Sequence, residues 1–440
     1  TAVSADRGRA PLAGPYAAST PLLLSGLDDR VVALLRDELE PFGLVALQAG
    51  GGQANKPATA GAVPPSFIDG GSIGVQLIRG DINATAIGTV THVVGSKLVA
   101  FGHPMMNAGQ PALPTCTARV LHVLASQQRS FKIAESLEPL GTLVHDRQAA
   151  IVVDSGLRAD TVPMVLRLHG VKGAPRTEWR VELASQRLLT PMLAFSALLN
   201  ALGVSAGERN DAVFSAKSRV KVEGHAPVEL ADFGYTPLGM GSPLALGQLR
   251  MFDAIAAAYG NPFEAARIES IELDLDVRFE RDVIELHEAL VQSSEVDPGR
   301  DLNVYLTLQR FGQPEEVKIV KVHVPARAAG QKIELLFQPG GEVELERPEP
   351  TSLEQIFDNV RLGYPSTSLV ISTKLATTGV KLRGHVVRDL PGSALDTLQL
   401  SSEGGNRPTF ATQLHEELPL GQVVFGTARI PLDVREEPLR

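Results

Sequence analysis

Residues 80–104, GDINATAIGTVTHVVGSKLVAFGHP, are the most informative stretch of this chain for its fold. The β-branched and aliphatic residues between 84 and 101 predict two strands, and a Gly-Ser pair places a tight turn between them. The second strand runs directly into Gly102-His103-Pro104. A histidine at a strand end, between glycine and proline, suits a functional side chain better than a core one, although a plain turn accounts for the same residues.

Strand patterns with glycine and proline turns continue on both sides of this stretch. The segment SIGVQLI precedes it, and short apolar or β-branched runs predict further strands at 117–124, 150–154, 162–170 and 177–184. One helix is clear in this part of the chain. Thr190 has the N-cap position, Pro191 the first helical position, and the apolar run that follows ends at Gly203.

A regular two-residue alternation begins at residue 268. Ile271, Leu273 and Leu275 share one face of a predicted strand, and acidic residues occupy the positions between them. The segment 302–308 repeats the pattern. Such alternation is typical of an antiparallel sheet with one face over a core, and its spacing suggests a β-sandwich. The sequence therefore predicts a mainly-β protein with some α.

The chain is too long for one ordinary domain, because it has 440 residues. Changes in composition and pattern divide it into five predicted segments. These are a small β-α-β segment at 1–50, a Gly/Ala/Pro-rich linker at 51–65, a strand-rich domain at 66–232, a helical connector at 233–265 and a sandwich-like domain at 266–440.

Charge and cysteine content exclude several classes of function. The formal net charge is −9 and no Lys/Arg cluster occurs, so nucleic acid is not an expected partner. Cys116 is the only cysteine and fits a small buried apolar residue. The ten histidines lack metal-ligand spacing, so we expect no metal and no cofactor. No apolar run reaches the ~18 residues of a membrane span.

Several short motifs together resemble the SpoIVB-type serine peptidase family, the bacterial sporulation proteases and their relatives. The likeness covers about residues 66–170. It rests on Gly80-Asp81, Ala86-Ile87-Gly88-Thr89-Val90-Thr91, Ala100-Phe101-Gly102-His103-Pro104, Ser130-Phe131-Lys132, Gly141-Thr142-Leu143 and Asp146-Arg147. Each motif alone is weak, and the combination is specific.

The resemblance implies a chymotrypsin-like β-barrel core in which His103 is the general base. Histidine suits that role because its ordinary pKa lies near neutral pH. The resemblance also implies a place outside the cytoplasmic membrane, in the periplasm or secreted. On that basis we interpret the first residues, TAVSADRG, as the start left by removal of a signal peptide.

The nucleophile is the uncertain part of the predicted site. Active family members carry a Gly-Met-Ser-Gly-Ser-Pro motif, and the closest string here is Gly239-Met240-Gly241-Ser242-Pro243, which lacks one residue. Ser242 is therefore the candidate nucleophile, while a chance match remains an alternative. Ser155, in Asp154-Ser155-Gly156, is a second candidate in a turn. Asp146 is the candidate acid that orients the histidine, although a turn-forming ion pair explains it equally well.

Two functions from different classes follow from these residues. One is a secreted or periplasmic serine endopeptidase-like protein that acts on a peptide or protein, with His103 as base. The other is an inactive protein with a protease fold that serves as a structural or protein-binding component of the bacterial envelope. The defective serine motif is compatible with both functions. A long edge strand in the C-terminal part also allows assembly with a second copy.

Overall fold

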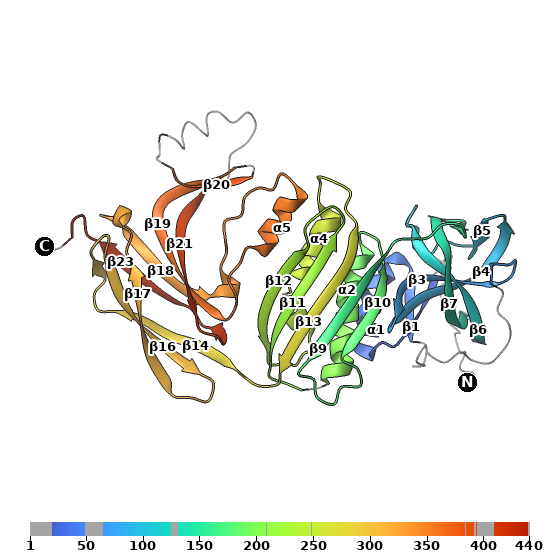
Figure 1. Cartoon of the computed structure of the whole chain (residues 1–440), viewed down its shortest axis with the longest axis horizontal. Helices are drawn as coiled ribbons and strands as arrows, with labels where there is room; N and C mark the ends of the chain where they lie inside the picture. The colour runs from blue at the N-terminus through green and yellow to red at the C-terminus, as the bar shows by residue number, and fades with distance from the viewer. Residues whose placement is uncertain are drawn as a thin grey trace, which may run out of the picture. The chain divides into compact units, whose positions relative to one another are not determined.

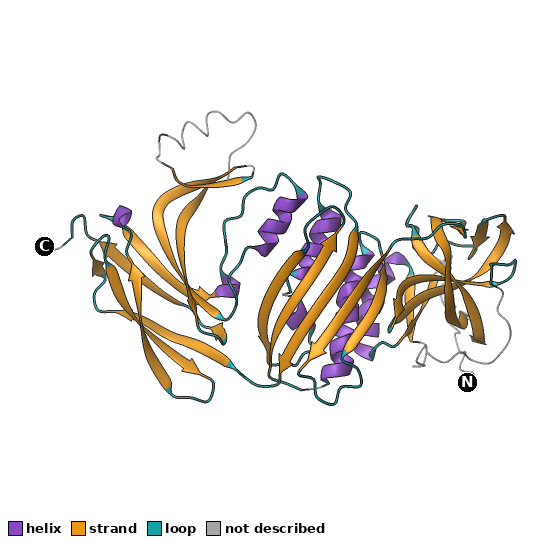
Figure 2. Cartoon of the chain, viewed as in Figure 1, coloured by secondary structure: helices purple, strands orange, loops and turns teal. Residues whose placement is uncertain are grey.

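The computed structural model describes residues 20–48, 65–124, 131–207, 209–247, 249–382, 384–390, 393 and 409–438. The predicted linker at 51–65, apart from Pro65, and Ser130 of the family motif lie outside these residues. Strands make up 52% and helices 16% of the structure, which confirms the mainly-β prediction (Figure 2). By its internal contacts the chain divides into two compact units, Thr1–Val162 with Val181–Ala197, and Pro163–Arg180 with Leu198–Arg440.

The first unit is built on a closed antiparallel ring of strands. Each strand pairs with the next in the order β3-β4-β5-β8-β7-β6, and β6 pairs back to β3. A ring of this kind leaves no free strand edge. Its strands are β3 (Ser72–Gly80), β4 (Asn83–Val94), β5 (Lys97–Ala100), β6 (Leu113–Leu124), β7 (Phe131–Arg147) and β8 (Ala150–Asp154).

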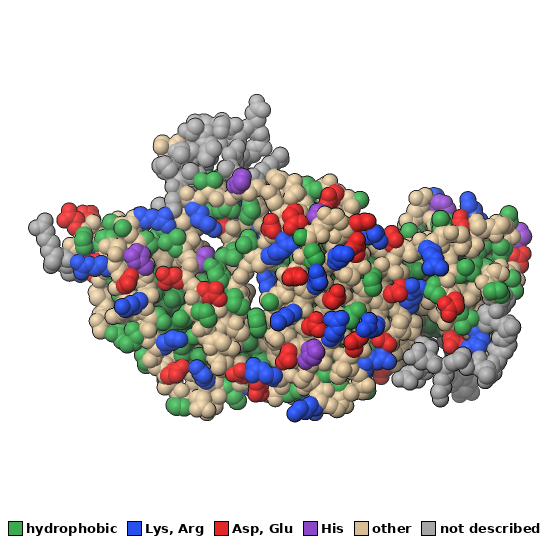
Figure 3. All heavy atoms as spheres, viewed as in Figure 1, with side chains coloured by type: hydrophobic (Ala, Val, Ile, Leu, Met, Phe, Trp, Pro, Cys, Tyr) green, Lys and Arg blue, Asp and Glu red, His purple; other side chains and the backbone are tan. Residues whose placement is uncertain are grey.

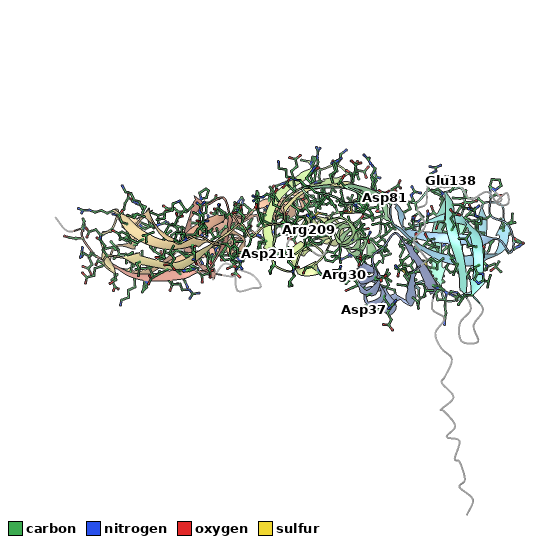
Figure 4. All side chains as sticks on the ribbon, turned by 90° about the horizontal axis from the view of Figure 1, so that it is seen from below. Arg30, Asp37, Asp81, Glu138, Arg209 and Asp211 are labelled. Atoms are coloured by element: carbon green, nitrogen blue, oxygen red, sulfur yellow. The ribbon has the colours of Figure 1, made fainter. Side chains whose placement is uncertain are left out.

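A β-α-β segment extends this ring, as the sequence predicts. Strand β1 (Thr20–Ser25) pairs with β4 and, in parallel, with β2 (Leu44–Gln48). Between them, α1 (Asp29–Leu39) begins at Asp28, whose side chain accepts a hydrogen bond from the Arg30 backbone. Arg30 and Asp37 lie on the exposed side of α1 (Figure 4). The buried side carries Val31, Val32, Leu35 and Leu39.

The second unit contains a sheet with the order β12-β11-β13-β9 (Figure 1). Its strands are β11 (Ala212–Val222), β12 (Val228–Thr236), β13 (Ile268–Arg278) and β9 (Thr161–His169). The boundary between the units passes through β9, through β10 (Glu178–Ala184) and through helix α2 (Leu189–Ala206). Among the described residues, α2 alone has the length and apolar composition of a membrane-spanning helix, and 72% of it is buried in the protein.

The predicted helical connector at 233–265 contains two separate helices. The structure has a short α3 (Pro243–Leu246) and a separate α4 (Met251–Gly260). The backbone N–H of Arg250 donates to the Asp232 carboxylate at 3.1 Å, and the Arg250 guanidinium bonds the same carboxylate at 2.6 Å. This long-range contact sets the start of α4, and no local sequence pattern signals it.

Two further sheets of the second unit enclose one apolar core. The first has the order β17-β16-β14-β22, and the second β15-β23-β18-β19-β20 with β21 beside β19. Leu306 and Leu308 of one sheet share this core with Leu335 and Phe337 of the other. The strands are β14 (Val283–Val291), β15 (Glu295–Val296), β16 (Asp301–Arg310), β17 (Glu315–His323), β18 (Lys332–Pro339), β19 (Ser368–Leu382), β20 (His385–Leu390), β21 (Thr409–Pro419), β22 (Val423–Phe425) and β23 (Ala428–Val434); helix α5 (Leu353–Arg361) precedes β19.

Candidate functional site

The loop that joins β5 to β6 holds an unusual concentration of left-handed backbone. Phe101, Asn107 and Ala112 have φ values of 72°, 56° and 51°, and among the described non-glycine residues only Asp211 shares this property. A conformation of this kind costs about 1–3 kcal/mol per residue and persists where the surrounding structure enforces it. Such residues cluster at functional sites, so this loop is the candidate site of the first unit.

Phe101 is held against the glycine of the Gly88-Thr89 motif. Its backbone N–H donates to the Thr89 carbonyl at 3.0 Å. Its ring occupies the space above Gly88, because a Cβ atom placed there would lie 2.1 Å from the ring. The centroid of the same ring lies 5.7 Å from that of His103. The glycine at 88 is thus required for Phe101 to pack beside the histidine.

The His103 ring is half-buried and is oriented by its own chain neighbour. Its Nδ1 atom lies 2.8 Å from the Pro104 carbonyl oxygen, which also accepts a 3.3 Å hydrogen bond from the Thr20 hydroxyl. A carbonyl oxygen only accepts, so Nδ1 carries the proton of the neutral ring. Nε2 is then the acceptor nitrogen, and it has no hydrogen-bond partner among the described residues.

Asp146 holds the loop that follows the histidine. Its carboxylate is completely buried and accepts backbone hydrogen bonds from Met105 at 2.7 Å, Met106 at 2.8 Å and Ala108 at 3.1 Å. Its backbone also exchanges two hydrogen bonds with Gly109. The sequence suggests Asp146 as the acid that orients His103. In the structure the carboxylate contacts the loop backbone, and the Pro104 carbonyl orients the ring.

The two candidate serines belong to different units. The Ser155 hydroxyl belongs to the same unit as His103, is exposed and donates to the Ser96 carbonyl at 3.0 Å. Ser242 belongs to the second unit, where it precedes Pro243 at the start of α3, and its backbone N–H donates to Gly239. No described serine of the first unit donates a hydrogen bond to the His103 ring.

Other motif residues have structural roles near the loop. Lys132 Nζ donates to the Thr89 hydroxyl at 2.6 Å, and burial lowers the pKa of this lysine. Gly141 has a φ of 79° and lies against the Asp154 carbonyl, where a side chain would clash. The Lys132–Thr89 contact and the Pro104 carbonyl were not singled out from the sequence. The carbonyl carries no sequence signal, since every residue has one.

Metal-ligating and charged groups are dispersed. The described residues contain no cluster of three or more His, Cys, Asp or Glu side chains placed to hold a metal ion. Cys116 is fully buried, as expected, and its burial raises the pKa of the thiol to about 11. On the face drawn in Figure 3, basic and acidic side chains are interspersed.

The loop therefore offers one oriented imidazole with a free acceptor nitrogen, in a rigid and strained backbone. Such a group can take a proton from a hydroxyl or a water that approaches Nε2. No protein-family model matches this chain, and no curated protein matches it. The assignment of a function thus depends on the motif residues and on the geometry of the loop.

Proposed function

We propose that this chain is a SpoIVB-type serine-peptidase-like protein that works outside the cytoplasmic membrane, with His103 as the general base. The observation that carries the proposal is the 2.8 Å hydrogen bond from His103 Nδ1 to the Pro104 carbonyl. It leaves Nε2 free to take a proton, and Nε2 is the atom that receives the serine proton in the serine–histidine mechanism. The substrate would be a peptide or a protein.

The proposal includes a chymotrypsin-like core for the first unit. The closed antiparallel ring of β3 to β8 supports it, because peptidases of the chymotrypsin type carry their catalytic residues on antiparallel β-barrels. The strained loop that carries His103 supports it as well. Strain of this kind holds a catalytic group in place before the substrate arrives.

In the proposed reaction, the serine oxygen bonds to the substrate carbonyl carbon while Nε2 takes the hydroxyl proton. The imidazolium then gives this proton to the leaving amine, and water releases the acyl group by the same two proton transfers. The Pro104 carbonyl keeps Nδ1–H oriented throughout. A neutral carbonyl stabilises an imidazolium less than the carboxylate of a complete Ser-His-Asp triad does.

A second function, an envelope protein that binds other proteins without catalysis, is favoured by a different observation. The Ser155 hydroxyl, in the same unit as His103, donates to the Ser96 carbonyl and not to the His103 ring, and Ser242 belongs to the other unit. A nucleophile must come within hydrogen-bond reach of its base, although catalytic contacts are often loose in a protein without substrate. The two functions therefore differ in whether a serine of the chain reacts.

A fluorophosphonate probe, which labels activated serines, distinguishes the two functions. We would treat the full chain and its His103→Ala, Ser242→Ala and Ser155→Ala variants, and map the labelled serine by mass spectrometry. His92→Ala is the matched control, because His92 is an exposed histidine of the same unit that pairs with Asp69. Circular dichroism of each variant checks that it is folded.

Labelling of one serine that is lost in His103→Ala and kept in His92→Ala would support the peptidase and identify its nucleophile. Labelling that persists in His103→Ala would contradict the role of His103. The absence of any label in folded protein would favour the non-catalytic binding function.

A further inference from the structure

The second unit has a cleft of about 350 Å³ that the proposed peptidase chemistry does not use. One wall is the face of the sheet formed by the neighbouring strands β12, β11 and β13 (Figure 1). The other wall is formed by Thr367 and the segment 421–423, which lies just before and within β22. Ligands commonly bind in clefts of this size where two layers of a protein meet.

Strand register places Phe233, Ser215 and Asp276 in one row across the floor of the cleft. Ser215 is the pairing partner of Phe233 on β12 and of Asp276 on β13. Side chains of directly paired residues share a face of the sheet, and adjacent strands lie about 4.8 Å apart. The small Ser215 side chain thus leaves a notch between an aromatic ring and a carboxylate.

The Asp276 carboxylate is exposed and has no hydrogen-bond or ion-pair partner among the described residues. The one cation in the lining is Arg278, and its guanidinium is already occupied by Glu280 at 2.6 Å and Asp282 at 3.0 Å. The lining also includes Gln422, whose buried Oε1 atom has no donor in the part of the chain that the structure describes. The cleft therefore presents two acceptor groups without a donor among the described residues, the Asp276 carboxylate and Gln422 Oε1.

The next row of the sheet closes one end of the notch. Val213 pairs with Tyr235 on one side and with Arg278 on the other. The Tyr235 hydroxyl donates to Asp211, which is labelled in Figure 4 and immediately precedes β11. These contacts hold the row in place, so the notch is a formed feature of the sheet.

We propose that this notch binds the arginine side chain of a peptide or protein partner. The guanidinium would lie over Ser215, stack on the Phe233 ring and donate two hydrogen bonds to Asp276. Phe233 is 39% exposed, which leaves its ring available for stacking. Arginine fits better than lysine, because its planar fork matches both an aromatic face and a carboxylate.

This proposal does not depend on the proposed peptidase activity. The notch lies wholly within the second unit, whereas His103 and its loop belong to the first. Fluorophosphonate labelling reports on the reacting serine and its histidine, and peptide binding reports on the notch. Either proposal can therefore fail while the other holds.

Isothermal titration calorimetry at low ionic strength tests the notch with four capped tripeptides. They are acetyl-Gly-Xaa-Gly-amide with arginine, lysine, citrulline or glutamate in the centre. Citrulline has nearly the shape of arginine but no charge. The full chain is compared with Asp276→Asn, Phe233→Leu and a control, Glu229→Gln, which removes an exposed carboxylate from the same sheet at a site outside the cleft lining.

We expect the arginine peptide to bind with a Kd of about 1 mM or below, and the citrulline peptide to bind at least ~10-fold more weakly. Asp276→Asn should weaken the arginine peptide ~10-fold, Phe233→Leu about 3-fold, and Glu229→Gln not at all. Equal binding of arginine and citrulline, unchanged binding by Asp276→Asn, or no binding by folded protein would each overturn the proposal. Tighter binding of lysine would overturn the stacking geometry.

Discussion

The buried carboxylate of Asp146 lies 2.7 Å from the backbone nitrogen of Met105, a residue 41 positions earlier in the chain. The same side chain bonds the backbone of Met106 and Ala108. One side chain of β7 thus fixes the loop that presents His103. The position of the loop depends on the strand that holds it. Substitutions on β7 should therefore alter the position of His103.

Asp146→Asn should loosen this loop. An asparagine replaces one accepting oxygen with an NH₂ group, so at least one buried backbone N–H loses its acceptor at a cost of about 1–3 kcal/mol in the free energy of unfolding. Hydrogen exchange followed by mass spectrometry should show faster exchange at residues 105–109. Asp154→Asn is the control, because the Asp154 side chain accepts from the exposed Gly156 backbone N–H in its own turn. Unchanged exchange at 105–109 would contradict the role given to Asp146.

Gly88→Ala should disturb the packing of Phe101. The added methyl group would lie 2.1 Å from the ring, and overpacking of this kind lowers stability by about 1–3 kcal/mol. The cost should largely disappear in a Phe101→Ala background, which a double-mutant cycle measures by thermal denaturation. Gly260→Ala is the control, since nothing lies within 4 Å of the added atom there. An equal cost with and without the ring would show that another contact is responsible.

Cys116 should be unreactive while the protein is folded. Burial raises the pKa of this thiol to about 11, so on the order of one molecule in a thousand carries the reactive thiolate at about pH 8. Ellman's reagent should detect no thiol in native protein and one per chain after denaturation in guanidinium. Rapid reaction of the native protein would show that β6 opens readily around this residue.

The two-sheet part of the second unit should lose stability as the pH falls through about 6.5. Burial lowers the pKa of His415, which bonds the Ser372 hydroxyl at 2.9 Å, below its ordinary value of 6.5. The unfolded chain then binds a proton at a higher pH than the folded one, so this contribution is full above the unfolded pKa and declines below it.

Urea denaturation of the full chain at about pH 7.5 and about pH 5.5 measures this loss. His415→Gln should reduce the difference between the two conditions, and His323→Gln, at an exposed histidine of the same unit, should leave it unchanged. An identical pH dependence in His415→Gln and the parent chain would assign the loss to other groups.

Local sequence patterns alone predict the elements of this protein well. The apolar face of α1, the existence of helix α2 and the alternation of β13 and β16 are visible in the sequence. Each depends on residues a few positions apart, through helical period or the two-residue period of a strand. The mainly-β class follows from these patterns, and the Gly-His-Pro motif marks the loop that the structure shows to be strained. The predicted ends of α2 are wrong, because the helix begins at Leu189, before the expected cap at Thr190, and continues through Gly203 to Ala206.

Only the tertiary structure decides which of these elements meet. The closure of β6 onto β3, the contact of Asp146 with the backbone near Met105 and the row that joins Phe233 to Asp276 each depend on distant segments. The sequence also does not predict that the Pro104 carbonyl, and not a carboxylate, orients His103. Strand register and backbone hydrogen bonds are set by the packing of the whole unit, and a side-chain pattern confined to one segment does not specify them.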